Sequence, residues 1–205
     1  IENLKQAYSS LSTHHFHSWE GQYGIHHCWV EVNQKLGDWA FEKEEFETAL
    51  RYYDEACMYP KNLEVAPRTP DFRAHVYWNL AKVYISLNKQ DVGNAYLQKI
   101  ISEKYTRTHL GTYYQALAQK ALNNSSKYRS LLDRLENHAR KLTSGEFQYR
   151  GTPETIGHYL LSLVLEEKGS NNEAAAERRK ALARNPRVVR GAIREAQLDI
   201  ARTHQ

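Results

Sequence analysis

The chain has 205 residues, 25% of them charged, and a formal charge of +4 at pH 7, so it is long enough for one domain or for an array of small units that share a core. Two cysteines cannot form a disulfide framework for this length, which favours a reducing compartment and a cytoplasmic location. No apolar run is long enough to span a membrane, and no signal peptide opens the sequence. Because the first residue is Ile1 and the only methionine is Met58, we expect a fragment of a longer protein.

Residues 1–28 form a segment rich in histidine and aromatic residues. Its second half, HHFHSWEGQYGIHHC at 14–28, holds five of the ten histidines. His15, His17, His26 and Cys28 could supply nitrogen and sulfur ligands to zinc. The tract lacks the paired spacing of a zinc site, however, and its interleaved aromatic residues are typical of packing. We therefore expect residues 1–28 to cap the helices that follow, and keep a metal-binding module or metal-dependent enzyme built on residues 14–28 as the alternative.

Apolar residues recur at intervals of three and four beyond residue 28, and no sustained alternation indicates a strand. This pattern predicts an all-α chain. Prolines and glycines divide it into helix pairs at approximately 30–62, 74–104, 111–141 and 155–187. Each pair carries a leucine followed by a small residue that lets its two helices approach closely. These are Leu36-Gly37, Leu80-Ala81, Leu117-Ala118 and Leu161-Ser162, and the third pair is expected to have one extra residue in its turn.

The helix pairs resemble the tetratricopeptide repeat, which has a Leu-Gly pair, spaced small residues, an aromatic residue and a closing proline. LGDWAFEKEEFETALRYYDEACMYPKN, at 36–62, shows all of these features. The resemblance covers residues 29–202 and implies an α-α superhelix of about four helix pairs. The apolar stripe of residues 188–202 predicts a helix that caps the end of the stack.

Three phrases carry a closer resemblance: APRTPDFRAHVYWNLAKVY, LGTYYQALAQKAL and GHYLLSLVLEEKG. They are similar to the C-terminal repeat region of large bacterial proteins whose N-terminal part is a β-rich domain of unknown function. This resemblance implies that any chemistry belongs to a domain outside this chain. It supplies no catalytic residue.

The first helix of each pair is expected to line a concave groove that binds a protein or peptide segment, or a further domain of the same protein. The residues expected to face this groove are Gln34, Lys35, Asp38, Trp78, Asn79, Lys82, Gln115, Gln119, Tyr159 and Leu163. Asn79 and Lys82, with Lys35, resemble positions that hold a peptide backbone or carboxylate in chaperone-binding relatives. Asp38 stands where such a clamp has a neutral Asn, so a polar groove without a tight peptide partner remains the alternative.

Catalytic motifs are missing from the sequence, which has neither Gly-x-Ser-x-Gly nor a phosphate-binding glycine loop. We expect a non-enzymatic interaction scaffold with no catalytic residue and no cofactor. Nucleic-acid binding is not expected, because the basic stretch 178–202 lies in a region without aromatic residues. The acidic stretch 38–55 and this basic stretch attract only weakly at physiological salt. A monomer is therefore expected, with self-association through Arg187, Arg190 and Arg194 only at low salt.

Overall fold

The computed structural model describes residues 1–17, 25–58, 60–64, 71–105, 108–144 and 153–184, without the side chains of His27, Asp71 and Phe72. All regular structure in these ranges is helical, which confirms the all-α prediction. Contacts divide the chain into two compact units, Ile1–Lys104 and Tyr105–Gln205. In the same described ranges, no helix combines the length and the apolar character that a transmembrane segment needs.

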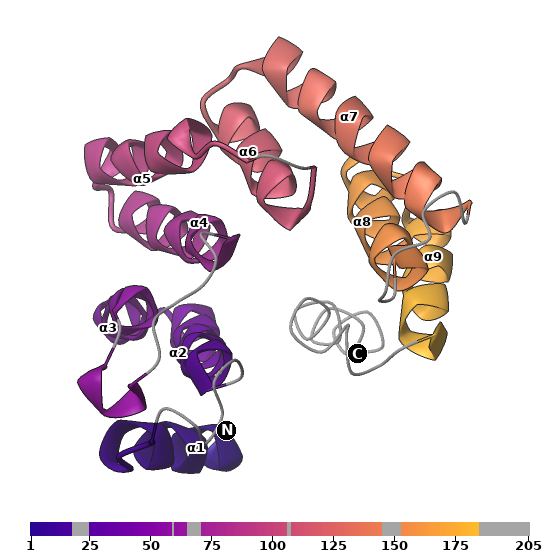
Figure 1. Cartoon of the computed structure of the whole chain (residues 1–205). Helices are drawn as coiled ribbons and strands as arrows, with labels where there is room; N and C mark the ends of the chain where they lie inside the picture. Colours follow the sequence, from indigo (N-terminus) through magenta and orange to yellow (C-terminus); the bar gives the residue numbers. More distant parts are fainter. Residues whose placement is uncertain (18–24, 59, 65–70, 106–107, 145–152, 185–205) are drawn as a thin grey trace. The chain divides into compact units, whose positions relative to one another are not determined.

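The first unit contains two helix hairpins and an additional N-terminal helix (Figure 1). Its described elements are α1 (Glu2–Thr13), α2 (Ile25–Glu42), α3 (Phe46–Cys57), the 3-10 helix η1 (Lys61–Leu63), α4 (Asp71–Ser86) and α5 (Gln90–Ser102). Helix α2 packs against α3, and α4 packs against α5. The two hairpins contact each other through α3 and α4. The hairpins overlap the first two ranges expected for repeats.

The described residues of the second unit form two further hairpins. Its described helices are α6 (Leu110–Ala121), α7 (Ser125–Thr143), α8 (Pro153–Glu167) and α9 (Asn171–Arg184). Helix α6 packs against α7 and α8 against α9, and α7 also packs against α8. The capping helix expected at 188–202, with Arg187, Arg190 and Arg194, lies outside the described residues.

All four hairpins turn through the same backbone conformation. One residue in each turn has a positive φ angle, between 58° and 81°, and the next residue donates its N–H to the carbonyl five positions earlier. In the first hairpin, for example, the N–H of Glu45 lies 2.9 Å from the carbonyl oxygen of Ala40. This bond satisfies a carbonyl group that a helix end leaves without a partner. The left-handed residues are Glu44, Asn88, Asn123 and Gly169.

The shared turn fixes the register of the small residues. The positions seven residues before the left-handed residue are Gly37, Ala81, Ala116 and Ser162. The prediction of an extra residue in the third turn is therefore wrong, and Ala116 rather than Ala118 is the equivalent small residue. In the other three hairpins a second small residue, Ala or Gly, follows twelve positions after the first. The third hairpin has the large Tyr128 at that position, so the sequence pattern did not reveal the correct register.

Helix α1 belongs to the segment that was expected to cap the first hairpin, and it does pack against α2. The Tyr8 ring stacks on the Trp29 ring with centroids 5.7 Å apart, and the Tyr8 hydroxyl donates to Glu55 Oε2 at 2.7 Å. Leu11 is buried in the same core. The segment is not uniform over 1–28, however, because residues 2–13 are helical and α2 already begins at Ile25.

Close helix packing predicts the effect of adding one methyl group at Gly157. A Cβ atom there would lie 2.9 Å from the carbonyl oxygen of Ala139 and 2.7 Å from Leu142 Cβ, so α8 and α7 would have to separate. Overpacking of this kind costs roughly 1–3 kcal/mol, partly offset by the higher helix propensity of Ala. We expect Gly157→Ala to lower the free energy of unfolding by about 1–2 kcal/mol in urea denaturation.

Gly169→Asn is the matched control, because Gly169 has a φ of 81° with no atom near its missing side chain and two equivalent turns already carry Asn. It should change the free energy of unfolding by less than about 1 kcal/mol. If Gly157→Ala is as stable as the parent, α7 and α8 do not approach as closely as described.

Candidate functional site

A chain of polar side chains joins α2 to α4 in the first unit. Gln34 and Asp38 lie one turn apart on α2, and His75 and Asn79 lie one turn apart on α4. Gln34 Nε2 is 2.8 Å from His75 Nδ1, and Asn79 Nδ2 donates to Asp38 Oδ1 at 3.2 Å. These two contacts connect the first helices of neighbouring hairpins.

Asp38 is the centre of this network. The Tyr53 hydroxyl on α3 donates to Asp38 Oδ1 at 2.6 Å, so the same carboxylate oxygen receives hydrogen bonds from two helices. Tyr53 is fully buried and Asn79 is only 2% exposed. Asn79, which was expected to face the groove, therefore positions Asp38 from within the network. A charged group in such a place needs these hydrogen bonds, because an unsatisfied one would be costly.

His75 is neutral at pH 7. The pKa of its imidazole is lowered to about 4, mainly by burial. The negative charge of Asp38 opposes this shift, and the positive charges of Lys82 and Lys35 contribute to it. The neutral ring can accept a hydrogen bond from Gln34, and its Nε2 lies 3.5 Å from Asn79 Nδ2. The network thus contains one carboxylate and no imidazolium.

Three of the expected groove residues surround the network with partly exposed side chains: Lys35 on α2, and Trp78 and Lys82 on α4. The Lys82 ammonium lies 5.3 Å from the centre of the Phe41 ring, a cation–π distance. The charges of Asp38, Lys82 and Lys35 all act on His75, and these three charges sum to +1. That Lys35, Asn79 and Lys82 bind a peptide stays a prediction.

The remaining expected groove residues belong to the second unit and are buried. Gln115 is 9% exposed, and Gln119, at 5%, accepts a hydrogen bond from Asn124 in the α6–α7 turn. Tyr159 and Leu163 on α8 pack in a core cluster with Ala181 of α9. These side chains stabilise their own unit.

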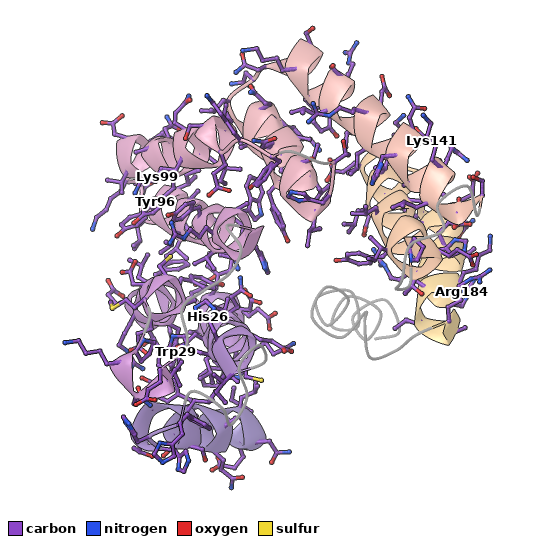
Figure 2. All side chains as sticks on the ribbon, viewed as in Figure 1. His26, Trp29, Tyr96, Lys99, Lys141 and Arg184 are labelled. Carbon is purple, nitrogen blue, oxygen red and sulfur yellow. The ribbon has the colours of Figure 1, made fainter. Side chains whose placement is uncertain are left out.

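The histidine tract is only partly within the described residues. His15 Nε2 lies 2.8 Å from Glu64 Oε1, and the rings of His15 and His17 are 5.9 Å apart. His26 lies at the start of α2, where Cys28 is exposed (Figure 2). In the described ranges no three His, Cys, Asp or Glu side chains come together as a metal site.

Sequence reasoning missed His75. The available signal was its helical spacing, because His75, Asn79 and Lys82 recur at intervals of four and three and share one face of α4. A second feature that it missed is a polar pocket on α7. Comparison with protein-family models, curated proteins and solved structures finds no match for this chain.

The neutral state of His75 predicts a pH-dependent stability. Its pKa of about 4 in the folded chain lies below the ordinary value of 6.5, so the unfolded chain binds more protons between these values. The contribution to stability is complete above about pH 6.5 and is lost as the pH falls toward 4. We expect His75→Gln to reduce the loss of unfolding free energy between pH 7 and pH 4.5 by roughly 1–3 kcal/mol, measured by urea denaturation.

His17→Gln is the control, because it removes an exposed histidine that lies outside the network. The effect of His75→Gln on the slope of stability against pH should be the larger of the two. A His75→Gln variant with the parent slope would contradict the neutral, hydrogen-bonded ring.

Proposed function

We propose that this chain is a non-enzymatic protein-interaction module whose α2–α4 surface binds a carboxylate-bearing peptide segment of a protein. Lys35 and Lys82 bind the carboxylate, and Trp78 contacts the neighbouring apolar part of the segment. The four hairpins are, in this proposal, tetratricopeptide-like repeats of an α-α superhelix. The observation that carries the binding proposal is the hydrogen-bonded network that holds α2 and α4 together beneath these side chains.

The repeat assignment is supported by the backbone. Four turns share one left-handed residue and one hydrogen-bond pattern, and a small residue stands at the same distance before each turn. An added Cβ at Gly37 would lie 2.5 Å from the Tyr53 ring, and one at Gly93 would lie 2.6 Å from Ile85 Cγ1. Both hairpins of the first unit therefore rely on the same kind of close helix approach, as expected of repeated units.

Charge supports an anionic group on the bound segment. Lys35 and Lys82 are only partly exposed, so their charges are less screened than those of fully hydrated lysines. The neutral His75 adds no positive charge of its own, and Asp38 cancels one of the two ammonium charges. The net charge of +1 attracts a single carboxylate and repels a lysine-rich segment.

The network also explains why this surface suits a defined ligand. Side chains that are already held by hydrogen bonds lose little freedom when a ligand binds, so less of the binding energy is lost to ordering. Asp38 is held from two sides, by Tyr53 and by Asn79. The carboxylate beside the proposed site is therefore fixed before a peptide binds.

The proposal is tested by selecting peptides from a random display library on the full chain and measuring their affinity by fluorescence anisotropy. We expect enrichment of acidic peptides, and a loss of affinity of about 10-fold or more in Lys82→Glu, because the local charge then falls from +1 to −1. Asp38→Asn should act in the opposite direction. It keeps an acceptor for Tyr53 while it raises the local charge to +2, so acidic peptides should bind several-fold more tightly.

Lys104→Glu is the matched control, since it changes the same charge at an exposed position after α5. Its affinity should stay within about 2-fold of the parent, as is usual for a distant surface charge. The proposal fails if no acidic peptide is enriched, or if Lys104→Glu and Lys82→Glu weaken binding equally.

A further inference from the structure

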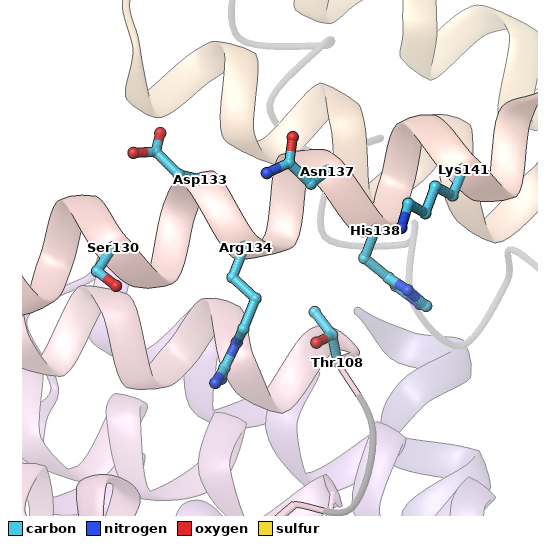
Figure 3. A pocket seen from close by; sticks show the side chains of 7 residues that line it. All are labelled: Thr108, Ser130, Asp133, Arg134, Asn137, His138 and Lys141. Carbon is cyan, nitrogen blue, oxygen red and sulfur yellow. The ribbon is translucent and has the colours of Figure 1, made fainter.

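A polar pocket lies on α7 and on the segment before α6, both within the second unit (Figure 3). Its lining side chains are Thr108, Ser130, Asp133, Arg134, Asn137, His138 and Lys141. Arg134 and His138 extend from the helix on the side where Thr108 lies. All seven residues are polar or charged, so the pocket offers hydrogen-bonding and charged groups to a ligand.

The basic side chains of the pocket follow one face of the helix. Arg134, His138 and Lys141 are separated by four and three residues, the spacing that places side chains above one another on a helix. The one acid in the lining, Asp133, is bound by Lys168 at 3.0 Å. Within the described residues neither Arg134 nor Lys141 forms an ion pair, so the pocket is open to an external anion.

Hydrogen-bond donors complete the lining. Thr108 and Ser130 contribute hydroxyl groups and Asn137 contributes an amide, all of which can donate to anionic oxygens. The planar guanidinium of Arg134 matches a phosphate group with two parallel donors. The Cα atoms of Arg134 and Lys141 lie about 10 Å apart along the helix axis, from a rise of about 1.5 Å per residue. Both side chains are long, so their two cationic groups can converge on two linked anionic groups in the pocket.

We propose that this pocket binds a small ligand with two linked phosphate groups, with Arg134 on one phosphate and Lys141 on the other. Thr108 and Ser130 donate to the phosphate oxygens from the flanks. The site is independent of the peptide-binding proposal, because it lies on α7 and uses none of the α2 and α4 side chains.

His138 makes the binding depend on pH. Burial lowers the pKa of its imidazole, and the nearby His109 at the start of α6 and Lys141 on α7 lower it further. A bound diphosphate favours the protonated ring, so it raises this pKa again. His138→Gln should therefore weaken binding more at pH 6 than at pH 8, a comparison in which the protonation of the ligand is the same for both proteins.

The direct test is calorimetric titration of the full chain with pyrophosphate, inorganic phosphate, ADP and citrate at constant ionic strength. We expect saturable binding of pyrophosphate, weaker binding of phosphate and little binding of citrate, whose carboxylates fit the arginine fork but not the phosphate geometry. Arg134→Gln and Lys141→Gln should each weaken pyrophosphate binding about 10-fold. ADP distinguishes the ligand's source: tighter binding than pyrophosphate assigns a nucleoside diphosphate, and equal or weaker binding assigns a free diphosphate.

Arg129→Gln controls for charge alone, because Arg129 is an exposed residue of α7 that does not line the pocket. Its pyrophosphate affinity should stay within about 2-fold of the parent. The proposal is overturned by the absence of saturable pyrophosphate binding, by equal binding of citrate, or by a loss in Arg129→Gln as large as that in Arg134→Gln. Circular dichroism of each variant verifies that the helices remain folded.

Discussion

The close antiparallel packing of two helices across a left-handed turn is the constraint on which the described structure depends. One residue with positive φ reverses the chain, and the next N–H satisfies a carbonyl at the helix end. The second helix therefore starts directly beside the first. A small residue must then stand where the two helices approach, because a Cβ at Gly37 would collide with Tyr53. Since single helices of this length are marginal alone, this packing supplies most of their stability.

The same backbone leaves each hairpin free to carry different polar groups. In the first unit, α2 and α4 carry a hydrogen-bond network centred on Asp38. In the second unit, the equivalent helices α6 and α8 carry buried polar residues. The network has a cost, since buried polar groups must all be satisfied. The network joins the first helices of two neighbouring hairpins, and in our proposal Lys35 and Lys82 bind a ligand beside it.

Local patterns in the sequence were sufficient for the helix pairs and for the shared face of Asn79 and Lys82 on α4, because both follow from helical spacing within one segment. Long-range contacts were not predictable in this way. The packing of α1 depends on Trp29, and the network depends on how α2 crosses α4, which no single segment encodes. The third turn was misread for a local reason, because Tyr128 stands where the other hairpins have a small residue.

Zero-length carbodiimide cross-linking tests the central claim, that the α2–α4 surface is the binding site for carboxylates, most directly. The full chain is incubated with synthetic peptides rich in Glu, and the linked lysines are identified by mass spectrometry. Our account predicts that Lys35 and Lys82 carry most of the linked peptide, and that excess unlinked acidic peptide competes with the reaction. Equal labelling of exposed lysines such as Lys89 and Lys104, unaffected by competitor, would contradict it.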